Sequence, residues 1–348
     1  MRAGLTALLL TLIASVGALL GLALATEYRP EPLEQAAPHC HDDQATGLQG
    51  DSFKVMSWNL QYSAGRKLQF FYDGGSDVSV PTEQLHETLA GISAALRTVN
   101  PDLVLLQEVD RDSRRSARLD QLPTLAAASG ATCILSSPYH RSPFVPHPPS
   151  DPLGRVDMHL ALLTPGGMLN GWRQALPLLQ ESALRRVFNL KRALLWAELP
   201  LAGSKQPLAI ATSHLSAFSA GDGTLSRQLA ALDQWIKTRP EGQPWLLGAD
   251  LNALPPGDLP QRLPGDVRAY RAAAPAMAAL LSTHRSAFPL AETGSRTYLP
   301  FTAQEPDRTI DYLLYGGPIT LLNSRVAREY SHLSDHLPLI AEFALTEP

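Results

Sequence analysis

Residues 244–252 read PWLLGADLN, an apolar run that ends directly in an aspartate and an asparagine. The apolar part, Trp245–Leu247, has the length and composition of a buried strand. The same pattern recurs along the chain, where an apolar strand candidate carries a carboxylate, amide or imidazole at or beside its end. The residues concerned are Asn59, Glu108, His214, Asp250, Asn252, Asp311, Asp335 and His336. In layered α/β folds, functional sites collect at strand ends on a rigid scaffold, so the pattern predicts an α/β fold with one polar site.

The region around these residues is predicted to be one folded domain over residues 52–346. Strand candidates outnumber helix candidates, which favours packed sheets with helices outside them. The strands are expected at Phe53–Gln61, Asp102–Gln107, Met158–Leu163, Ala193–Leu199, Leu208–Thr212, Trp245–Leu247, Ile310–Leu314 and Leu339–Phe343. The helices are expected at Thr82–Val99, Thr224–Thr238 and Ala272–Leu281.

The N-terminus is predicted to be a membrane anchor or a signal peptide over residues 1–26. The 24 residues from Ala3 to Thr26 carry no charge and follow Arg2, and about 20 apolar residues span a bilayer as a helix. Ala23-Leu24-Ala25 also has the small-x-small pattern of a cleavage site. An uncleaved anchor is favoured and a cleaved, secreted form is the alternative. Both predict that the rest of the chain is exported to the periplasm or outside the cell. Residues 27–51, rich in proline and charge, are expected to be a linker.

Composition excludes several classes of protein. The chain has 348 residues, 45% of them hydrophobic, and a net charge of −4. These values exclude a disordered chain, and they argue against binding duplex DNA through a broad positive face. Two cysteines are too few for a disulfide-stapled mini-protein. Cys40 and Cys133 are expected either to pair in an oxidising compartment or to remain two thiols.

Three other segments leave alternatives open. Gly65–Val80 is interpreted as a wall of the substrate site or as a solvated insertion, and Ser136–Pro152 as a long loop. Arg111, Arg114, Arg115 and Arg118 alternate with acidic residues, which favours a solvated face.

The polar residues at the strand ends suit a hard metal ion. Mg²⁺ is typically held by one or two carboxylates plus a substrate phosphate, so Glu108 with Asp335 or Asp250 is a candidate set. A zinc cluster is disfavoured because neither cysteine has a partner nearby in the sequence and no HExxH motif occurs.

Six short motifs, in this order, resemble those of the endonuclease/exonuclease/phosphatase superfamily, whose fold is that of DNase I. They are SWN at Ser57–Asn59, QEV at Gln107–Val109, SHLSA at Ser213–Ala217, GADLN at Gly248–Asn252, RTIDYLL at Arg308–Leu314 and SDHLP at Ser334–Pro338. The resemblance covers residues 52–344. The sequence departs from the usual pattern at Ala249 and Leu251, both small or apolar, and at Gln61, where abasic-site nucleases carry an acid. The last departure disfavours a DNA-repair role and a second metal.

The resemblance implies a four-layer α/β sandwich, with two packed mixed sheets flanked by helices. It also implies a Mg²⁺- or Mn²⁺-dependent hydrolase of phosphate esters. Its pattern assigns Asn59, Glu108 and Asp335 to the metal. It assigns catalysis to His214, Asp250, Asn252, Asp311 and His336.

In that pattern each catalytic residue has a role. Asp250 orients or deprotonates the attacking water, and Asn252 binds a phosphate oxygen. His214 and His336 stabilise the transition state or protonate the leaving oxygen. Asp311 orients one of the histidines. Arg192 and Arg308 are further candidates for holding the substrate phosphate, because arginine suits bidentate contact.

Two diester substrates compete, a lipid headgroup and extracellular nucleic acid. The alternatives are a phosphomonoesterase acting on a soluble ester and a non-catalytic binding protein of the same fold. A closed, arginine-rich pocket would favour a monoester, an open groove would favour a polymer, and an apolar rim near the anchor would favour lipid. The expected partners are therefore the phosphate-ester substrate and a membrane, and no protein partner is predicted.

Overall fold

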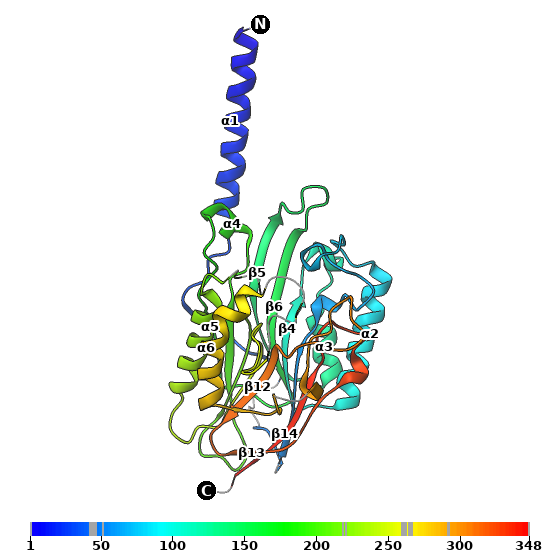
Figure 1. The fold of residues 1–348 in the computed structure, drawn as a ribbon, viewed down its shortest axis with the longest axis vertical. Coiled ribbons are helices and arrows are strands. Elements are labelled where there is room, and N and C mark those ends of the chain that lie inside the picture. Colours follow the sequence, from blue (N-terminus) through cyan, green and yellow to red (C-terminus); the bar gives the residue numbers. More distant parts are fainter. Residues whose placement is uncertain are drawn as a thin grey trace.

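The computed structural model describes residues 2–41, 47–50, 52–217, 219, 221–258, 263, 267–290 and 293–346. Within these residues the chain forms two sheets of seven strands each, which pack face to face (Figure 1). One sheet has the order β1 (Leu33–Gln35), β7 (Asn170–Ala175), β8 (Ala193–Leu199), β9 (Leu208–His214), β10 (Trp245–Asp250), β12 (Asp311–Gly316) and β11 (Arg285–Ser286). The other has the order β13 (Ile319–Val326), β14 (Leu339–Leu345), β3 (Ser52–Asn59), β4 (Leu103–Asp110), β6 (Gly154–Thr164), β5 (Cys133–Val145) and β2 (His39–Cys40).

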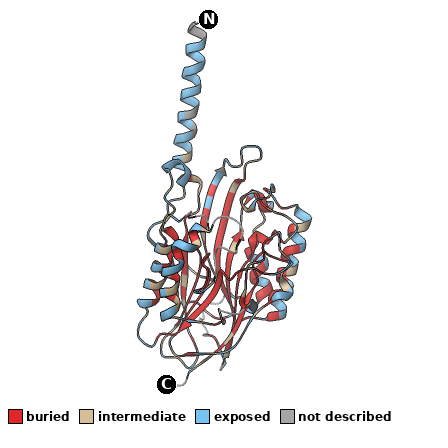
Figure 2. Ribbon diagram, in the orientation of Figure 1, coloured by how far each residue is buried: buried red, intermediate tan, exposed pale blue. Residues whose placement is uncertain are grey.

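Helices cover the outer face of each sheet, which confirms the predicted four-layer α/β sandwich (Figure 1). On one side, α2 (Thr82–Val99) and α3 (Leu122–Ser129) bury apolar side chains against β3 and β4. On the other, α5 (Thr224–Lys237) and α6 (Arg268–Thr283) do the same against β9 and β10. A third core lies between the sheets, so the central strands are buried on both faces (Figure 2). This explains why β4 is a continuous apolar run in the sequence.

The two sheets approach each other closely at Gly248 in β10. A Cβ atom there would lie 2.6 Å from Leu105 Cδ1 and 2.7 Å from Ser57 Oγ on the opposite sheet. Beside it, the Gln107 side chain donates to Thr212 Oγ1 across the same gap, at 2.8 Å. Glycine is therefore required at this position of the GADLN motif by packing.

Substituting Gly248 with alanine is expected to lower the free energy of unfolding by about 1–3 kcal/mol, the usual cost of overpacking a core. Gly294→Ala is the matched control, because a Cβ atom at Gly294 meets nothing within 4 Å. Urea denaturation measures both variants. Equal stability of the two would contradict the packing account.

The N-terminal helix α1 (Arg2–Ala25) projects away from the sandwich, and nearly all of its residues whose exposure is described are exposed (Figures 1 and 2). Its residues Leu5–Ala25 are long and apolar enough to cross a membrane. A signal sequence has the same length and composition. The structure therefore supports an apolar N-terminal targeting or anchoring segment and leaves both sequence alternatives in place.

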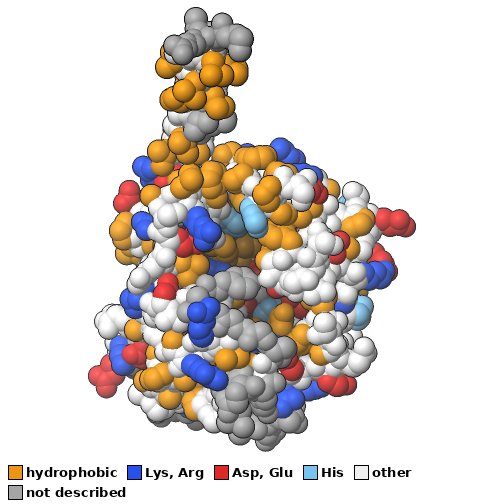
Figure 3. Space-filling model, turned by 45° about the horizontal axis from the view of Figure 1, so that its top comes forward, with side chains coloured by type: hydrophobic (Ala, Val, Ile, Leu, Met, Phe, Trp, Pro, Cys, Tyr) orange, Lys and Arg blue, Asp and Glu red, His pale blue; other side chains and the backbone are white. Residues whose placement is uncertain are grey.

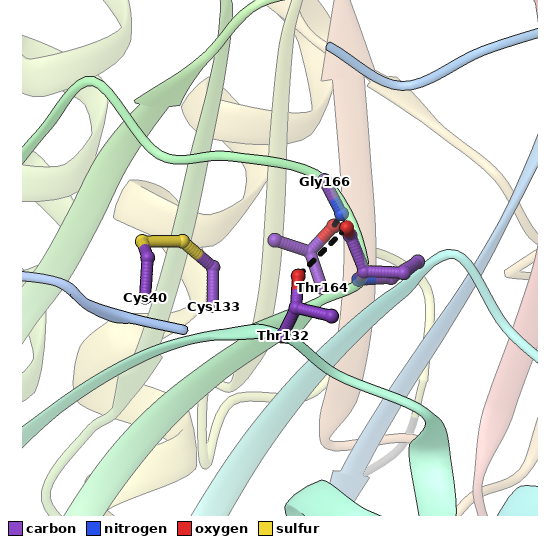
Figure 4. Close-up of a disulfide and its surroundings, with 6 residues drawn as sticks. Cys40, Thr132, Cys133, Thr164 and Gly166 are labelled. Carbon is purple, nitrogen blue, oxygen red and sulfur yellow. Dashed lines mark hydrogen bonds between the residues drawn. A yellow bond between two sulfur atoms is a disulfide. The ribbon is translucent and has the colours of Figure 1, made fainter. Parts of the chain in front are cut away.

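The segment after α1 differs from the expected linker. Strand β1 pairs with β7 through Leu33↔Gln174, and β2 pairs with β5 through Cys40↔Cys133. The two cysteines form a disulfide, which decides between the two alternatives for these residues (Figure 4). Residues 33–35 and 39–40 form strands because their backbone completes one edge of each sheet, a contribution that needs no apolar pattern of its own.

Candidate active site

Three of the predicted catalytic residues stand side by side on neighbouring strands. Asp250 ends β10, and the pairing register sets it opposite His214, the last residue of β9, and opposite Asp311, the first residue of β12. Residues in register on adjacent strands project to the same face with their Cβ atoms about 5 Å apart. The pairing register of the three strands therefore brings the carboxylates of Asp250 and Asp311 and the imidazole of His214 together.

Two residues from the other sheet face this row. Asn59 ends β3, and its side-chain amide donates to Asp250 Oδ2 at 3.0 Å and to Glu108 Oε1 at 3.4 Å. Glu108 lies at a bulge in β4, where the register with β6 shifts between Leu106 and Val109, and its φ is +56°. Left-handed backbone is costly for a glutamate and is concentrated at functional sites.

His336 precedes β14 and completes the cluster. Its Nδ1 lies 2.8 Å from Asp311 Oδ2, and Thr297 donates to the same oxygen from the opposite side at 2.6 Å. This leaves Nε2 directed at the site, 3.7 Å from Asp250 Oδ2. Asp311 therefore fixes the ring orientation of His336, as the sequence pattern implied.

The two histidines have opposite electrostatic surroundings. Burial alone would lower the pKa of His336, but Asp311, Asp250 and Asp335 together raise it well above its ordinary value. Burial lowers the pKa of His214 well below its ordinary value, and Arg192 and His336 lower it further. At neutral pH His336 is therefore a cation and His214 is neutral. Pairs of titratable groups with divergent pKa values are typical of acid–base sites.

His214 is held on both sides of its ring. The Tyr139 hydroxyl lies 3.0 Å from Nδ1, and Asp250 Oδ2 lies 3.3 Å from Nε2. With the hydroxyl donating to Nδ1, the proton of the neutral ring sits on Nε2 and points at Asp250. Burial raises the pKa of Asp250 to about 7, against the attraction of His336.

These side chains meet at one pocket of about 620 Å³. Of the predicted site residues, eight line it, namely Glu108, Arg192, His214, Asp250, Asn252, Arg308, Asp335 and His336. Asn59 and Asp311 lie behind them as hydrogen-bond partners. Asn252 has a φ of +47°, and its amide donates to Leu215 O at 3.0 Å. All ten residues are thus in one place, and their individual roles stay predictions.

The pocket contains donors that fit a divalent cation. Glu108 and Asp335 are carboxylates in the pocket wall, and no ion pair with lysine or arginine is found for either among the described residues. Uncompensated buried carboxylates are costly, and a hard cation with oxygen ligands removes that cost. A second group, Asp250, Asp311 and His336, has donor atoms within 4.8 Å of one another. In this second group, His336 Nδ1 already contacts Asp311 and the ring is cationic, so His336 is a poor metal ligand. The Glu108–Asp335 pair is therefore favoured for the metal.

Metal affinity is expected to fall as the pH falls. Burial raises the pKa of Glu108, with Arg115 opposing this and Asp335 adding to it, and burial also raises the pKa of Asp335 against His336 and Arg66. A raised pKa means that protons stay bound to higher pH and must be displaced by the metal. Calorimetric titration with Mn²⁺ at pH 5.5 and pH 7.5 measures this. Equal Mn²⁺ affinities at the two pH values would contradict the raised pKa values of Glu108 and Asp335.

Sequence reasoning missed several residues of the pocket. Tyr139, the partner of His214, lies in β5, inside a proline-rich stretch interpreted as a loop. Tyr72 and Asp73 come from the Gly65–Val80 segment, which proves to be a wall of the site. Arg115 was expected on a solvated face, but it is buried, forms a two-pronged ion pair with Asp110 and lies over the Tyr62 ring. Arg115 can be buried because the buried carboxylate of Asp110 compensates its charge.

Comparison with protein families gives one match, over residues 56–336, to the model described as the Endonuclease/Exonuclease/phosphatase family. The matched region begins within β3 and ends at His336, so it contains every predicted catalytic and metal-binding residue. No curated protein sequence matches the chain.

Solved structures show the same fold. An endonuclease/exonuclease/phosphatase from Beutenbergia cavernae is 20% identical, with a TM-score of 0.61, over 85% of this chain and 72% of that one. The human Nocturnin catalytic domain with bound sulfate is 19% identical, with a TM-score of 0.54, over 86% and 96%. A humanized TDP2 from D. rerio is 17% identical, with a TM-score of 0.55, over 84% and 99%.

Proposed function

The chain belongs to the endonuclease/exonuclease/phosphatase family, and on that premise we propose that it is a Mg²⁺- or Mn²⁺-dependent hydrolase of phosphodiester bonds. One observation carries the proposal: a carboxylate with a raised pKa, a neutral histidine and a cationic histidine meet in a single pocket beside Glu108 and Asp335, for which no ion pair with lysine or arginine is found among the described residues. Ester hydrolysis needs these parts, namely a base for water, a proton donor for the leaving oxygen and positive charge at the phosphate.

Each side chain has a place in this scheme. Asp250 accepts a proton from water at Oδ2, the atom on which Asn59, His214 and His336 converge. His336 supplies a positive charge at Nε2 and a proton for the leaving oxygen, and Asp311 keeps that ring charged and oriented. His214 contributes an N–H group without adding charge. Asn252 lines the same pocket and would bind a phosphate oxygen.

Glu108 and Asp335 would hold the cation, with Asn59 assisting through the hydrogen bond that its amide donates to Glu108 Oε1. When bound, a divalent cation neutralises charge on the phosphate oxygens and aligns the ester for attack. The oxygen donors of these residues support Mg²⁺ or Mn²⁺ over softer metals.

The arginines of the pocket favour a diester over a monoester. A phosphate monoester carries two negative charges and is best held by unpaired guanidinium groups. Arg115 pairs with Asp110, Arg308 pairs with Asp307, and Arg192 donates to His214 O at 3.2 Å. Within the part of the chain that the structure describes, the three arginines that line the pocket are therefore already engaged, which supports a substrate with one charge per phosphate.

We place the catalytic domain outside the cytoplasm, held at a membrane by α1. The apolar helix and the Cys40–Cys133 disulfide support this placement, since disulfides persist in oxidising compartments. A secreted form, cleaved after α1, is the alternative, and N-terminal sequencing of the mature protein decides between them.

Hydrolysis of bis-p-nitrophenyl phosphate and of p-nitrophenyl phosphate by the full chain, with EDTA and then with added Mg²⁺, tests the proposal. Faster, Mg²⁺-restored turnover of the diester is expected. Preference for the monoester would favour the phosphomonoesterase alternative. Turnover of neither ester, with the fold intact, would favour a binding protein.

A further inference from the structure

The base of α1 is fastened to the same segments that form the pocket. Glu27, two residues beyond the end of the helix, pairs with Lys191 at 3.0 Å, and both side chains are at least nine-tenths buried. Tyr28 lies under the guanidinium groups of Arg141 and Arg173. Lys191 is flanked by Leu190 and Arg192, which line the pocket. The domain is therefore held against the foot of α1 by fixed contacts, without a free tether.

The mouth of the pocket is apolar on this side. Val145 at the end of β5 and Phe188 at the end of α4 (Ala183–Phe188) line the pocket. Phe144, beside Val145, is 53% exposed, and Leu184, one helical turn before Phe188, is 49% exposed. We call this surface the apolar rim, which consists of Phe71, Phe144, Val145, Leu184 and Phe188. Figure 3 shows hydrophobic side chains gathered around a hollow at the foot of the projecting helix.

Exposed cations lie beside the apolar rim. Arg185 and Arg186 are exposed on α4, between Leu184 and Phe188. The Arg29 side chain, which pairs with Glu27, is 64% exposed at the base of α1. Apolar side chains interleaved with arginines are typical of surfaces that rest in the headgroup region of an anionic bilayer.

We propose that the apolar rim lies in the membrane surface beside α1, and that the substrate is the phosphodiester of a lipid headgroup entering the pocket directly from the bilayer. The inference rests on the proposed function and on α1 as a membrane span. The proposal is supported by position, because α1, the apolar rim and the mouth of the pocket all lie at one end of the molecule (Figures 1 and 3). Nucleic acid would instead require a continuous basic groove along its backbone, whereas Arg115, Arg192 and Arg308 of the pocket are already engaged within the protein.

Membrane contact is tested by a fluorophore on a single introduced cysteine. The two native cysteines are paired with each other, so Phe144→Cys or Leu322→Cys in the full chain gives one labelling site. Leu322 is the matched control: it is 54% exposed and lies on β13, at the end of the domain opposite α1 (Figure 1). In vesicles containing nitroxide-labelled lipid, quenching at position 144 and not at position 322 is expected. Equal accessibility to water at both positions would overturn the proposal.

Hydrolysis is tested in vesicles of phosphatidylcholine, phosphatidylethanolamine, phosphatidylglycerol, phosphatidylinositol and sphingomyelin, with plasmid DNA in a parallel reaction. Release of a phosphate-containing headgroup is expected, and Phe144→Ser with Leu184→Ser should slow it at least tenfold, since burying even one such side chain changes a partition equilibrium by about that factor. Leu322→Ser should leave the rate of lipid hydrolysis unchanged. Turnover of bis-p-nitrophenyl phosphate should stay within about twofold of the native rate in every variant, because none of these residues contacts the reacting groups.

The remaining outcomes separate the two proposals. Hydrolysis of the soluble diester or of DNA, with every lipid intact, would overturn the lipid substrate and leave the proposed function standing. Failure to hydrolyse the soluble diester as well as the lipids would overturn the proposed function, and the inference with it.

Discussion

Replacing Glu108 with glutamine is expected to reduce Mg²⁺-dependent diester hydrolysis about a thousandfold, while the fold stays intact. The carboxylate oxygen of Glu108 lies 3.4 Å from Asn59 Nδ2 and 3.5 Å from His214 Nδ1, at the centre of the proposed metal site. A bound metal contributes several kcal/mol to transition-state stabilisation, and each 1.4 kcal/mol corresponds to about tenfold in rate. Glutamine keeps the size of the side chain and removes its charge.

Two measurements accompany this variant. Because a buried carboxylate with a raised pKa is lost, the thermal stability of the metal-free Glu108→Gln protein should equal or exceed that of the native chain. Calorimetry should show weaker Mn²⁺ binding. Unchanged turnover, or unchanged metal affinity, would remove Glu108 from the site.

Asp250→Asn is expected to lower kcat by about 10²–10⁴-fold, the usual contribution of a general base. The asparagine cannot accept a proton from water, although it can still face Asn59, His214 and His336. Its effect should fall on kcat more than on KM, because the lost interaction belongs to the reaction step.

The matched control for Asp250→Asn is Asp151→Asn. Asp151 is an exposed carboxylate paired with Arg114, and it is not among the residues that line the pocket. The control should retain native turnover. A loss of less than about tenfold in Asp250→Asn would be too small for a general base.

The sequence allowed the central part of the fold and site to be predicted, because that part is built from local signals. Each strand that carries a site residue is an apolar run, and Asp250, His214 and Asp311 mark strand ends in the sequence as well as in the structure. The order of six motifs then indicated the family and the four-layer sandwich.

The rest depends on contacts between distant segments that leave no local pattern. Strands β1 and β2 have only three and two residues, too few to show an alternation of apolar and polar side chains. The sequence therefore predicts a linker for this region. Tyr139 meets His214 across 75 positions of sequence, and its own surroundings are rich in proline. The apolar rim was likewise hidden, because Phe144 and Leu184 come from separate elements whose exposure only the tertiary structure defines.

The most direct test of the central claim is the rate of bis-p-nitrophenyl phosphate hydrolysis by the EDTA-treated full chain as Mg²⁺ is added back, with Glu108→Gln titrated in parallel. A metal-dependent hydrolase should show no turnover without the ion and saturable recovery with it, and the variant should need far more Mg²⁺ or fail to recover. Turnover that is insensitive to EDTA, or equal in the two proteins, would contradict the assignment of this pocket as a metal-dependent phosphodiesterase site.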